Sequence, residues 1–190
     1  MGKKLVLKNV RFTWVRVFEP RDAFNSGKNR YEVTLLIPKT DKELINKVRK
    51  TIKELQDEYV AEHPRFVMPN PNTASGVKWN PIADGDDSKY SEEFGYFKIS
   101  AYRKEEDGAP LVIDKFKQPI TRKEDIYSGS WGVASIDAYI YDNAGGKGIS
   151  FGLNGLQKVK DDTAFGGGGA GNVEDDFDDE SGADDDPIFD

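Results

Sequence analysis

Two segments of this 190-residue chain alternate apolar and polar residues with a period of two, which limits the folds open to it. In residues 95–103, GYFKISAYR, the apolar side chains that share one side are Phe97, Ile99 and Ala101. Residues 131–142, WGVASIDAYIYD, repeat the pattern, and the apolar row is Ala134, Ile136, Ala138 and Ile140. This period is that of a strand with one buried face and one open face. The sequence therefore predicts a sheet that covers a core on one side.

Four further segments are rich in β-branched and aromatic residues, which predicts strands at 3–18, 30–38, 110–117 and 147–159. The connection DNAGGK at 142–147 favours a hairpin. One helix is indicated at about 41–62, because apolar residues recur there at three- and four-residue steps: Leu44, Val48, Ile52, Leu55 and Tyr59. Thr40 and Glu43 form a capping-box signal at its start. Residues 64–93 are predicted to be a long loop.

About six strands, one amphipathic helix and turn-rich connections fit a small, curved antiparallel barrel. We expect a mainly β, OB-fold-like domain over residues 1–160. From residue 161 the composition changes, because a glycine-rich run is followed by an acidic end. We expect residues 161–190 to be a flexible linker and a disordered acidic tail.

The charges are distributed unevenly along the chain. Residues 1–160 hold all 27 Lys and Arg with 22 acids, whereas residues 161–190 hold 12 acids and no base. A basic body with an acidic end suggests a surface that binds a polyanion, together with its own competitor. No segment is apolar enough to be a signal peptide or a membrane span, so we expect a cytoplasmic protein with no membrane partner.

Several kinds of chemistry are excluded or disfavoured by composition. There is no Cys, which excludes disulfides and thiolate chemistry, and the single His63 cannot make a two-histidine metal site. The acidic clusters at 84–87, 92–93 and 105–107 lie in turn-like stretches, whereas a two-metal nuclease needs carboxylates that converge from rigid elements. We therefore expect no enzymatic activity, no bound metal and no cofactor.

The polar faces of the two alternating strands carry tyrosines. Rings beside cations on an open sheet suit single-stranded nucleic acid, because each base stacks on a ring, worth roughly 1–3 kcal/mol, while cations follow the phosphates. The alternative is that tyrosines merely cover half-buried surface. The candidates for stacking are Trp14, Trp79, Tyr96, Tyr102, Tyr139 and Tyr141. The candidates for backbone contacts are Arg11, Lys98, Arg103, Lys115 and Lys117. Lys115 and Lys117, taken as alternate residues of one strand, also fit a solvated strand edge.

The chain ends in DDFDDESGADDDPIFD, in which an apolar pair, Ile188 and Phe189, follows a run of acids. Tethered carboxylates can compete with phosphates for a basic groove, and 30 flexible residues reach on the order of 30 Å. The apolar pair then suits an anchor for a second protein, towards which Asp184, Asp185 and Asp186 steer the tail.

The tip DDDPIFD resembles the acidic, aromatic-tipped tail of bacterial and phage single-stranded DNA-binding proteins. The block at 127–162 and the stretch LKNVRFTW at 7–14 are similar to a phage-encoded branch of that family. The resemblance implies an OB-fold that coats single strands in phage replication and recombination, with a tail that recruits replication proteins. In one respect the chain departs from the familiar tail, because Asp190 follows Phe189 and Pro187 precedes Ile188.

The sequence thus predicts a non-enzymatic protein that binds single-stranded DNA without sequence preference, in the bacterial host cytoplasm if phage-encoded. Two alternatives remain open: an acidic-tailed interaction or assembly factor that does not bind DNA, and a strand-annealing recombination protein. The sequence is compatible with a homodimer but does not determine the oligomeric state.

Overall fold

The computed structural model describes residues 2–22, 27–69, 78–143 and 146–166. Its seven strands are β1 (Lys3–Arg21), β2 (Arg30–Pro38), β3 (Ala83–Asp84), β4 (Tyr96–Lys104), β5 (Leu111–Ile113), β6 (Trp131–Asn143) and β7 (Gly146–Lys160). The α-helix is α1 (Lys42–Glu62). Four single-turn 3₁₀ helices lie in the connections, at Gly85–Asp87, Ser91–Glu93, Glu105–Asp107 and Lys123–Asp125.

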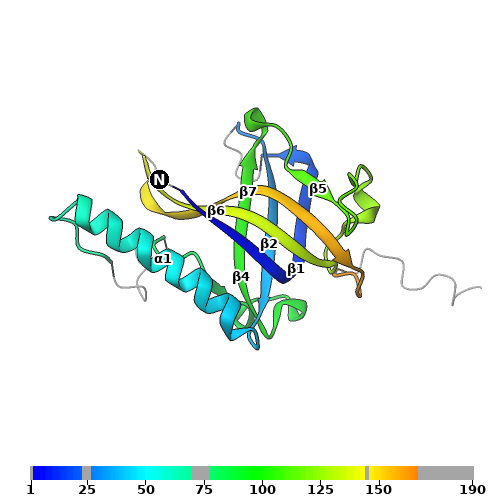
Figure 1. The fold of residues 1–190 in the computed structure, drawn as a ribbon, viewed down its shortest axis with the longest axis horizontal. Helices are drawn as coiled ribbons and strands as arrows, with labels where there is room; N and C mark the ends of the chain where they lie inside the picture. Colours follow the sequence, from blue (N-terminus) through cyan, green and yellow to red (C-terminus); the bar gives the residue numbers. More distant parts are fainter. Residues whose placement is uncertain (1, 23–26, 70–77, 144–145, 167–190) are drawn as a thin grey trace, which may run out of the picture.

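Five strands close into a barrel in the order β1, β2, β4, β7, β6 (Figure 1). The neighbours pair antiparallel except β4 and β7, which are parallel. The predicted OB-like barrel is confirmed, but its all-antiparallel pairing is wrong at this closure. The reason is one of parity: strands that alternate in direction cannot close a ring of odd number without one parallel pair.

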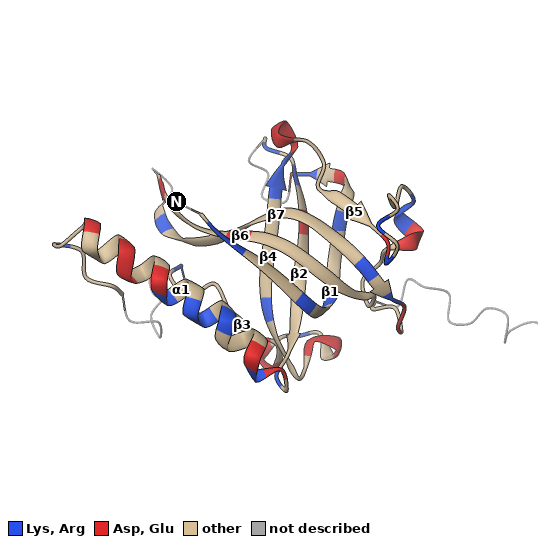
Figure 2. Cartoon of the chain, in the orientation of Figure 1, with Lys and Arg blue, Asp and Glu red and all other residues tan. Residues whose placement is uncertain are grey.

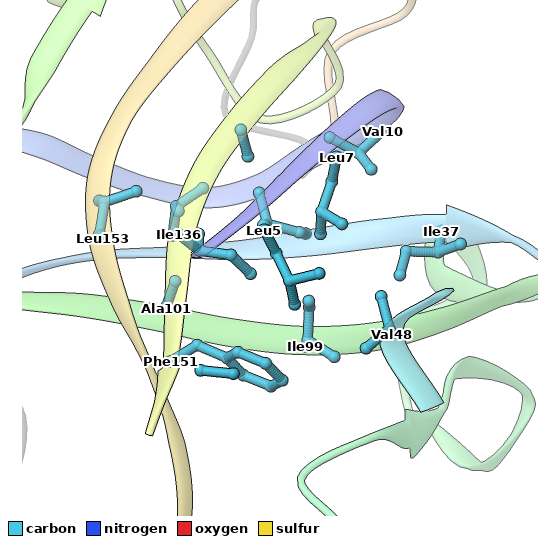
Figure 3. Packing of buried hydrophobic residues seen from close by; sticks show 14 of the residues in the cluster. Leu5, Leu7, Val10, Ile37, Val48, Ile99, Ala101, Ile136, Phe151 and Leu153 are labelled. Carbon is cyan, nitrogen blue, oxygen red and sulfur yellow. The ribbon is translucent and has the colours of Figure 1, made fainter. Parts of the chain in front are cut away.

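The alternation predicted for β4 and β6 matches the core of the barrel. Ile99 and Ala101 of β4 are buried, as are the predicted inward residues Ala134, Ile136 and Ala138 of β6. Leu5, Leu7 and Phe151 pack against them from β1 and β7 (Figure 3). The side chains between them on β4 and β6 are therefore free to form the outer wall, which is where the candidate site lies.

Helix α1 packs its apolar stripe on the barrel, and Val48 points towards Ile37 and Ile99 (Figure 3). The bounds agree with the predicted helix at about 41–62. The cap differs, because the carboxylate of Asp41, and not Thr40, accepts a hydrogen bond from the Leu44 amide at 3.0 Å. Among the described residues, none of the helices combines the length and apolar character required to cross a membrane.

Trp79 lies in the core, with 3% of its surface exposed. Its ring packs against Tyr59 at 4.9 Å and Phe66 at 5.1 Å, and its carbonyl accepts a hydrogen bond from Gln56 at 2.6 Å. The prediction that Trp79 stacks on a ligand is therefore wrong. The end of the long connection returns to the C-terminal half of α1, and the indole fills the space beneath the helix.

The predicted linker does not begin where the sequence suggested. Residues 161–166 lie against the barrel through several polar contacts, so the described domain extends beyond residue 160. The predicted tail residues Asp184, Asp185, Asp186, Ile188 and Phe189 lie outside the described residues.

Replacing Trp79 with Ala should lower the free energy of unfolding by about 3–5 kcal/mol, because it empties a packed aromatic site. Urea unfolding of the variant and the unmodified protein measures the difference. Val67, which is 84% exposed, provides the control, and Val67→Ala should change the same quantity by less than about 0.5 kcal/mol. Similar losses in the two variants would show that Trp79 is not part of the core.

Candidate nucleic-acid interface

The pairing register aligns side chains of β1, β2 and β4 in rows on the side of the sheet away from the core. The rows are Arg11–Leu36–Lys98, Thr13–Thr34–Ser100, Arg16–Glu32–Tyr102 and Arg21–Arg30–Lys104. We call this surface the β1–β2–β4 face. Six of its twelve side chains are basic and one is acidic. Figure 2 shows the Lys and Arg positions recurring along β1 and β4. The register therefore gathers cations from three strands onto one surface.

Glu32 sits among three arginines of this face. Its carboxylate pairs with Arg16 at 2.6 Å and Arg30 at 3.0 Å, and lies 3.8 Å from Arg21. The guanidinium of Arg30 also lies 4.9 Å from the centre of the Tyr102 ring. Because charge-assisted hydrogen bonds fix the orientation of a guanidinium, Glu32 holds the arginines in place while leaving the group cationic overall.

The face is hollowed around Arg30. One hollow of about 440 Å³ is lined by residues 27–30 together with Tyr102, Lys104 and two acids, Glu105 and Glu106. A second, of about 230 Å³, is lined by Trp14, the three arginines and Glu32. Arg30 lines both hollows, so they are neighbours at the end of the β1–β2–β4 face, and we call the two together the groove.

Trp14 reaches this groove because β1 is irregular there. The register of β1 against β2 shifts between Thr13 and Arg16, and Trp14 has a φ of 53°, in the left-handed region. A bulky residue rarely adopts that conformation, and a bulge of this kind re-aims a side chain. The indole is 39% exposed, and the Arg16 guanidinium lies 5.7 Å from its centre. Trp14, a predicted candidate for stacking, therefore lies at the surface.

A buried carboxylate, Glu93, supports Trp14 from below. Glu93 is 1% exposed and accepts hydrogen bonds from Lys98 at 2.5 Å and from the Trp14 indole at 3.3 Å. Burial by itself would raise the pKa of Glu93, but hydrogen bonds from Lys98 and Ser88 outweigh it and hold the pKa below its ordinary value. Glu93 is therefore ionised at neutral pH, and Lys98 is committed to pairing with it.

The predicted tyrosines fall into two places. Tyr102 and Tyr139 share a hydrogen bond between their hydroxyls at 2.7 Å, reaching across β7 at Gly152, which carries no side chain. Burial, and then this hydrogen bond, raise the pKa of Tyr139, so the phenol stays neutral. Burial also raises the pKa of nearby Tyr141. Tyr96 lies on the same side of β4, two residues before Lys98, with its ring 6.3 Å from that of Trp131. Of this set, Tyr102 lies within the four rows of the β1–β2–β4 face and Tyr96 just beyond them.

Lys115 and Lys117 do not lie on a strand, which corrects the prediction. β5 ends at Ile113, and the carboxylate of Asp114 accepts hydrogen bonds from the amides of Phe116 and Gln118, both at 2.8 Å. Such a side-chain bond turns the chain locally. The two lysines flank Phe116 at the tip of this turn, where Phe116 is 71% exposed and outside the rows of the face.

Arg103 lies outside the four rows of the face, near the end of β4, where the connection to β5 begins. Its guanidinium donates to the carbonyls of Gly108 at 2.8 Å and Asp107 at 2.6 Å. The side chain thus closes the connection between β4 and β5. In the part of the chain that the structure describes, no three His, Asp or Glu side chains gather as a metal site would require.

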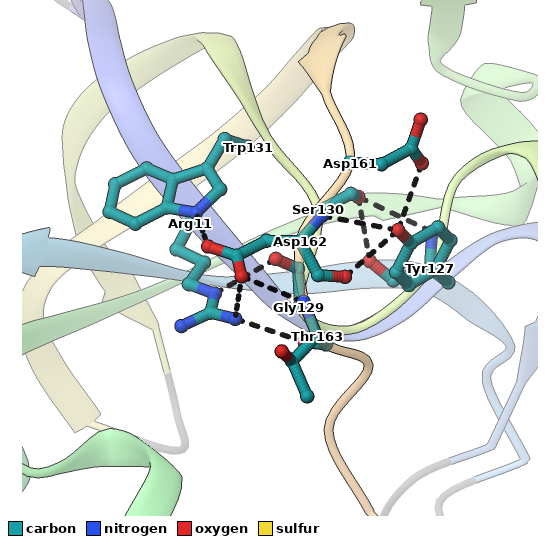
Figure 4. Close-up of polar contacts among 8 residues, drawn as sticks. All are labelled: Arg11, Tyr127, Gly129, Ser130, Trp131, Asp161, Asp162 and Thr163. Carbon is teal, nitrogen blue, oxygen red and sulfur yellow. Dashed lines mark hydrogen bonds and ion pairs between the residues drawn. The ribbon is translucent and has the colours of Figure 1, made fainter. Parts of the chain in front are cut away.

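Arg11 lies at the border of the face, next to Trp131 of β6, with which it is paired in register. The guanidinium is 5.6 Å from the centre of the Trp131 ring, and the ammonium of Lys160 is 4.9 Å from it. The indole donates a hydrogen bond to Asp162 at 2.7 Å (Figure 4). That bond holds the pKa of Asp162 below its ordinary value.

Sequence reasoning missed Trp131, Arg16 and Arg30 as site residues. The signal for Trp131 was present, because it falls on the same side of β6 as Tyr139 and Tyr141. Arg30 falls on the same side of β2 as Glu32, but the grouping of three arginines around one carboxylate requires the pairing of β1 with β2.

A closed five-strand barrel whose second and third strands carry a cationic, aromatic face is the arrangement by which OB-folds bind oligonucleotides. The comparison with known families agrees with this class. The chain belongs to the family described as Enterobacter phage Enc34, ssDNA-binding protein, whose model matches residues 3–188.

A curated relative, putative protein p50 of Acyrthosiphon pisum secondary endosymbiont phage 1, is 34% identical over 192 residues, covering 98% of each chain. Among solved structures, the single-stranded DNA-binding protein from bacteriophage Enc34 in complex with ssDNA matches with a TM-score of 0.65 and 26% identity, covering 86% of this chain and 89% of that one. Gp2.5 of bacteriophage T7 shares the fold, with a TM-score of 0.58 and 17% identity, covering 94% of this chain and 96% of that one.

Replacing Glu93 with Gln should lower the free energy of unfolding at pH 7 by about 1–3 kcal/mol, because Lys98 loses its ionised partner. The pKa of Glu93 is lower in the folded state, so its stabilising effect is complete above pH 4.5, the ordinary value, and is lost as the pH falls below it. Urea unfolding across a pH series should show the difference from the unmodified protein shrinking in acid.

The matched control for this series is Glu62→Gln, which makes the same change at an exposed position at the end of α1. A constant difference at every pH, or an equal effect of Glu62→Gln, would contradict the assignment of Glu93 as an ionised buried partner.

Proposed function

We propose that this protein binds single-stranded DNA without sequence preference, along the β1–β2–β4 face. The observation that carries the proposal is the gathering of Arg16, Arg21 and Arg30 beside the rings of Trp14 and Tyr102. The family to which the chain belongs supports it, as does the relative solved in complex with ssDNA.

The chemistry of the face accounts for binding without sequence preference. Arg16, Arg21 and Arg30 present guanidinium groups that pair with phosphate oxygens and release condensed counterions. The rings of Trp14 and Tyr102 offer planes on which bases stack, worth roughly 1–3 kcal/mol for each base. Neither contact depends on the identity of the base, since every base has a π-face and every nucleotide a phosphate.

A salt titration tests this proposal. Replacing Arg30 with Ala should weaken binding to an oligo-dT strand about tenfold and should make affinity less dependent on salt, since one phosphate contact is lost. Fluorescence anisotropy at several salt concentrations measures both quantities. Arg65, exposed and remote in sequence from the face, is the matched control, and Arg65→Ala should leave both unchanged. Equal losses in the two variants, or a flat salt dependence in the unmodified protein, would refute the assigned face.

The acidic C-terminal segment adds two proposed roles, competition with DNA and recruitment of other proteins. We infer that residues 161–190, which carry 12 acids and no base, compete with DNA for the basic face. On the same reasoning, Ile188 and Phe189 with the preceding acids recruit replication proteins in the bacterial host cytoplasm. The protein would then coat and protect single strands during replication and recombination, and expose its tip when DNA displaces the tail.

Two changes to the tail separate these roles. Removing residues 171–190 should tighten binding to oligo-dT at low salt, because the competing carboxylates are gone. Phe189→Ala should leave DNA affinity within about twofold of the unmodified protein but abolish capture of host or phage replication proteins. Unchanged or weaker DNA binding after truncation would contradict competition. Equal loss of DNA and protein binding in Phe189→Ala would contradict the division of roles.

A further inference from the structure

The chain does not leave the barrel where β7 ends. Residues 161–166, which we call the strap, contact Arg11 of β1 and Trp131 of β6 (Figure 4). Asp162 accepts the indole hydrogen bond of Trp131 at 2.7 Å and lies 3.5 Å from Arg11. The carbonyl of Thr163 accepts from Arg11 at 2.9 Å. The amide of Phe165 donates to Ser128 at 2.7 Å, and its ring lies 4.2 Å from the Arg11 guanidinium carbon.

These strap groups have the chemistry of a nucleotide. The carboxylate of Asp162 and the carbonyl of Thr163 place oxygen acceptors on a guanidinium, as a phosphate would. The flat ring of Phe165 lies against the same guanidinium, as a base would. The strap thus gives Arg11 an anionic and an aromatic partner at once.

Arg11 is positioned independently of these partners. Its Nε donates to the carbonyl of Gly129 at 2.8 Å, which leaves the Nη groups to the strap. The base of the strap is held separately, because Asp161 accepts from the Tyr127 hydroxyl at 2.8 Å and pairs with Lys158 at 2.6 Å. The backbone of Asp162 belongs to this base, because its carbonyl and its amide bond the Tyr127 hydroxyl at 3.0 and 3.3 Å. Displacement of the strap from Arg11 therefore needs only the Asp162 side chain and residues 163–166 to move.

The covered pair is continuous with the β1–β2–β4 face. Trp131 is paired with Arg11 across β6 and β1, Arg11 with Leu36, and Leu36 with Lys98. Tyr96 and Lys160 stand beside Trp131, at 6.3 Å between ring centres and 4.9 Å from the ammonium to the ring centre. A strand that crosses the face along this row arrives at the strap.

We propose that Arg11 and Trp131 form a further nucleotide subsite for single-stranded DNA, which the strap occupies as an internal mimic until DNA displaces it. The proposal rests on the proposed function, in which residues 161–190 compete with DNA, and it assigns a particular site to the first six of them. On displacement, a phosphate takes the place of Asp162 and Thr163 at Arg11, and a base stacks on the Trp131 ring. Only strands long enough to reach past the open face gain these contacts.

To test the proposal, Asp162 and Phe165 are both replaced by Ala in the full-length protein, which removes the side-chain contacts of the strap with Arg11 and Trp131. We call this double variant the loosened variant. It should bind long oligo-dT about three- to tenfold more tightly than the unmodified protein at low salt, because the competitor is lost. Strands too short to reach Trp131 should show no gain. The matched control is Asp57→Ala, Val67→Ala, which removes one exposed acid and one exposed apolar side chain outside the face, the strap and the tail, and should stay within about twofold.

Adding Trp131→Ala to the loosened variant should remove the gain. If the unmodified protein binds but the loosened variant binds no more tightly, or if the gain survives Trp131→Ala, the subsite is wrong while the proposed function stands. If the unmodified protein does not bind single strands at all, the proposed function fails and the subsite with it.

Hydrogen exchange in the unmodified protein tests the same proposal without any variant, so its result does not depend on whether the variants fold. The Phe165 amide, bonded to Ser128, should exchange its hydrogen faster when long oligo-dT saturates the protein, and at an unchanged rate with short strands. Unchanged or slower exchange with the long strand would overturn the proposal.

Discussion

The contact between β4 and β7 is the one on which the rest of the structure depends. It consists of two residue pairs, Ala101 with Phe151 and Tyr102 with Gly152. These pairs turn an open sheet into a barrel, so that Ala101 and Phe151 become fully buried. They also decide what lies on the outer wall. Because residue 152 has no side chain, Tyr102 reaches over β7 to Tyr139, and the ring of Tyr102 is held at the edge of the arginine cluster on β1 and β2.

Carboxylates organise the cationic surface that this closure creates. Glu32 orients three arginines, Glu93 pairs with Lys98 beneath Trp14, and Asp162 lies on Trp131 beside Arg11. Each acid lowers the net charge that DNA would meet, but each also holds a long cationic side chain or an indole in one orientation. Preorganised groups lose less conformational entropy when a ligand arrives. Glu32 belongs to a barrel strand and Glu93 to the connection that leads into β4, whereas Asp162 belongs to the strap, which we propose that DNA displaces.

The features predicted well from the sequence are those that local pattern controls. The alternation in β4 and β6 identified Ile99, Ala101 and Ile136 as core, and the apolar stripe identified α1, because both depend on spacing within a single element. The errors arose where a residue's partners are distant. Trp79 was correctly placed in a loop but was expected to contact a ligand, whereas its ring packs against Tyr59 of α1. Lys115 and Lys117 were predicted to lie on a strand, but that strand ends at Ile113, and the Asp114 side chain turns the chain directly after it.

The sequence by itself determined a barrel of half-buried strands with one amphipathic helix, a basic body and an acidic end. Periodicity and composition are properties of the chain read in order, so no neighbour is needed to see them. Only the tertiary structure decided that Arg16, Glu32 and Tyr102 form one row, and that the strap covers Arg11 and Trp131. Those neighbours depend on strand register, and a slip of one residue would move every side chain of a strand to the opposite face.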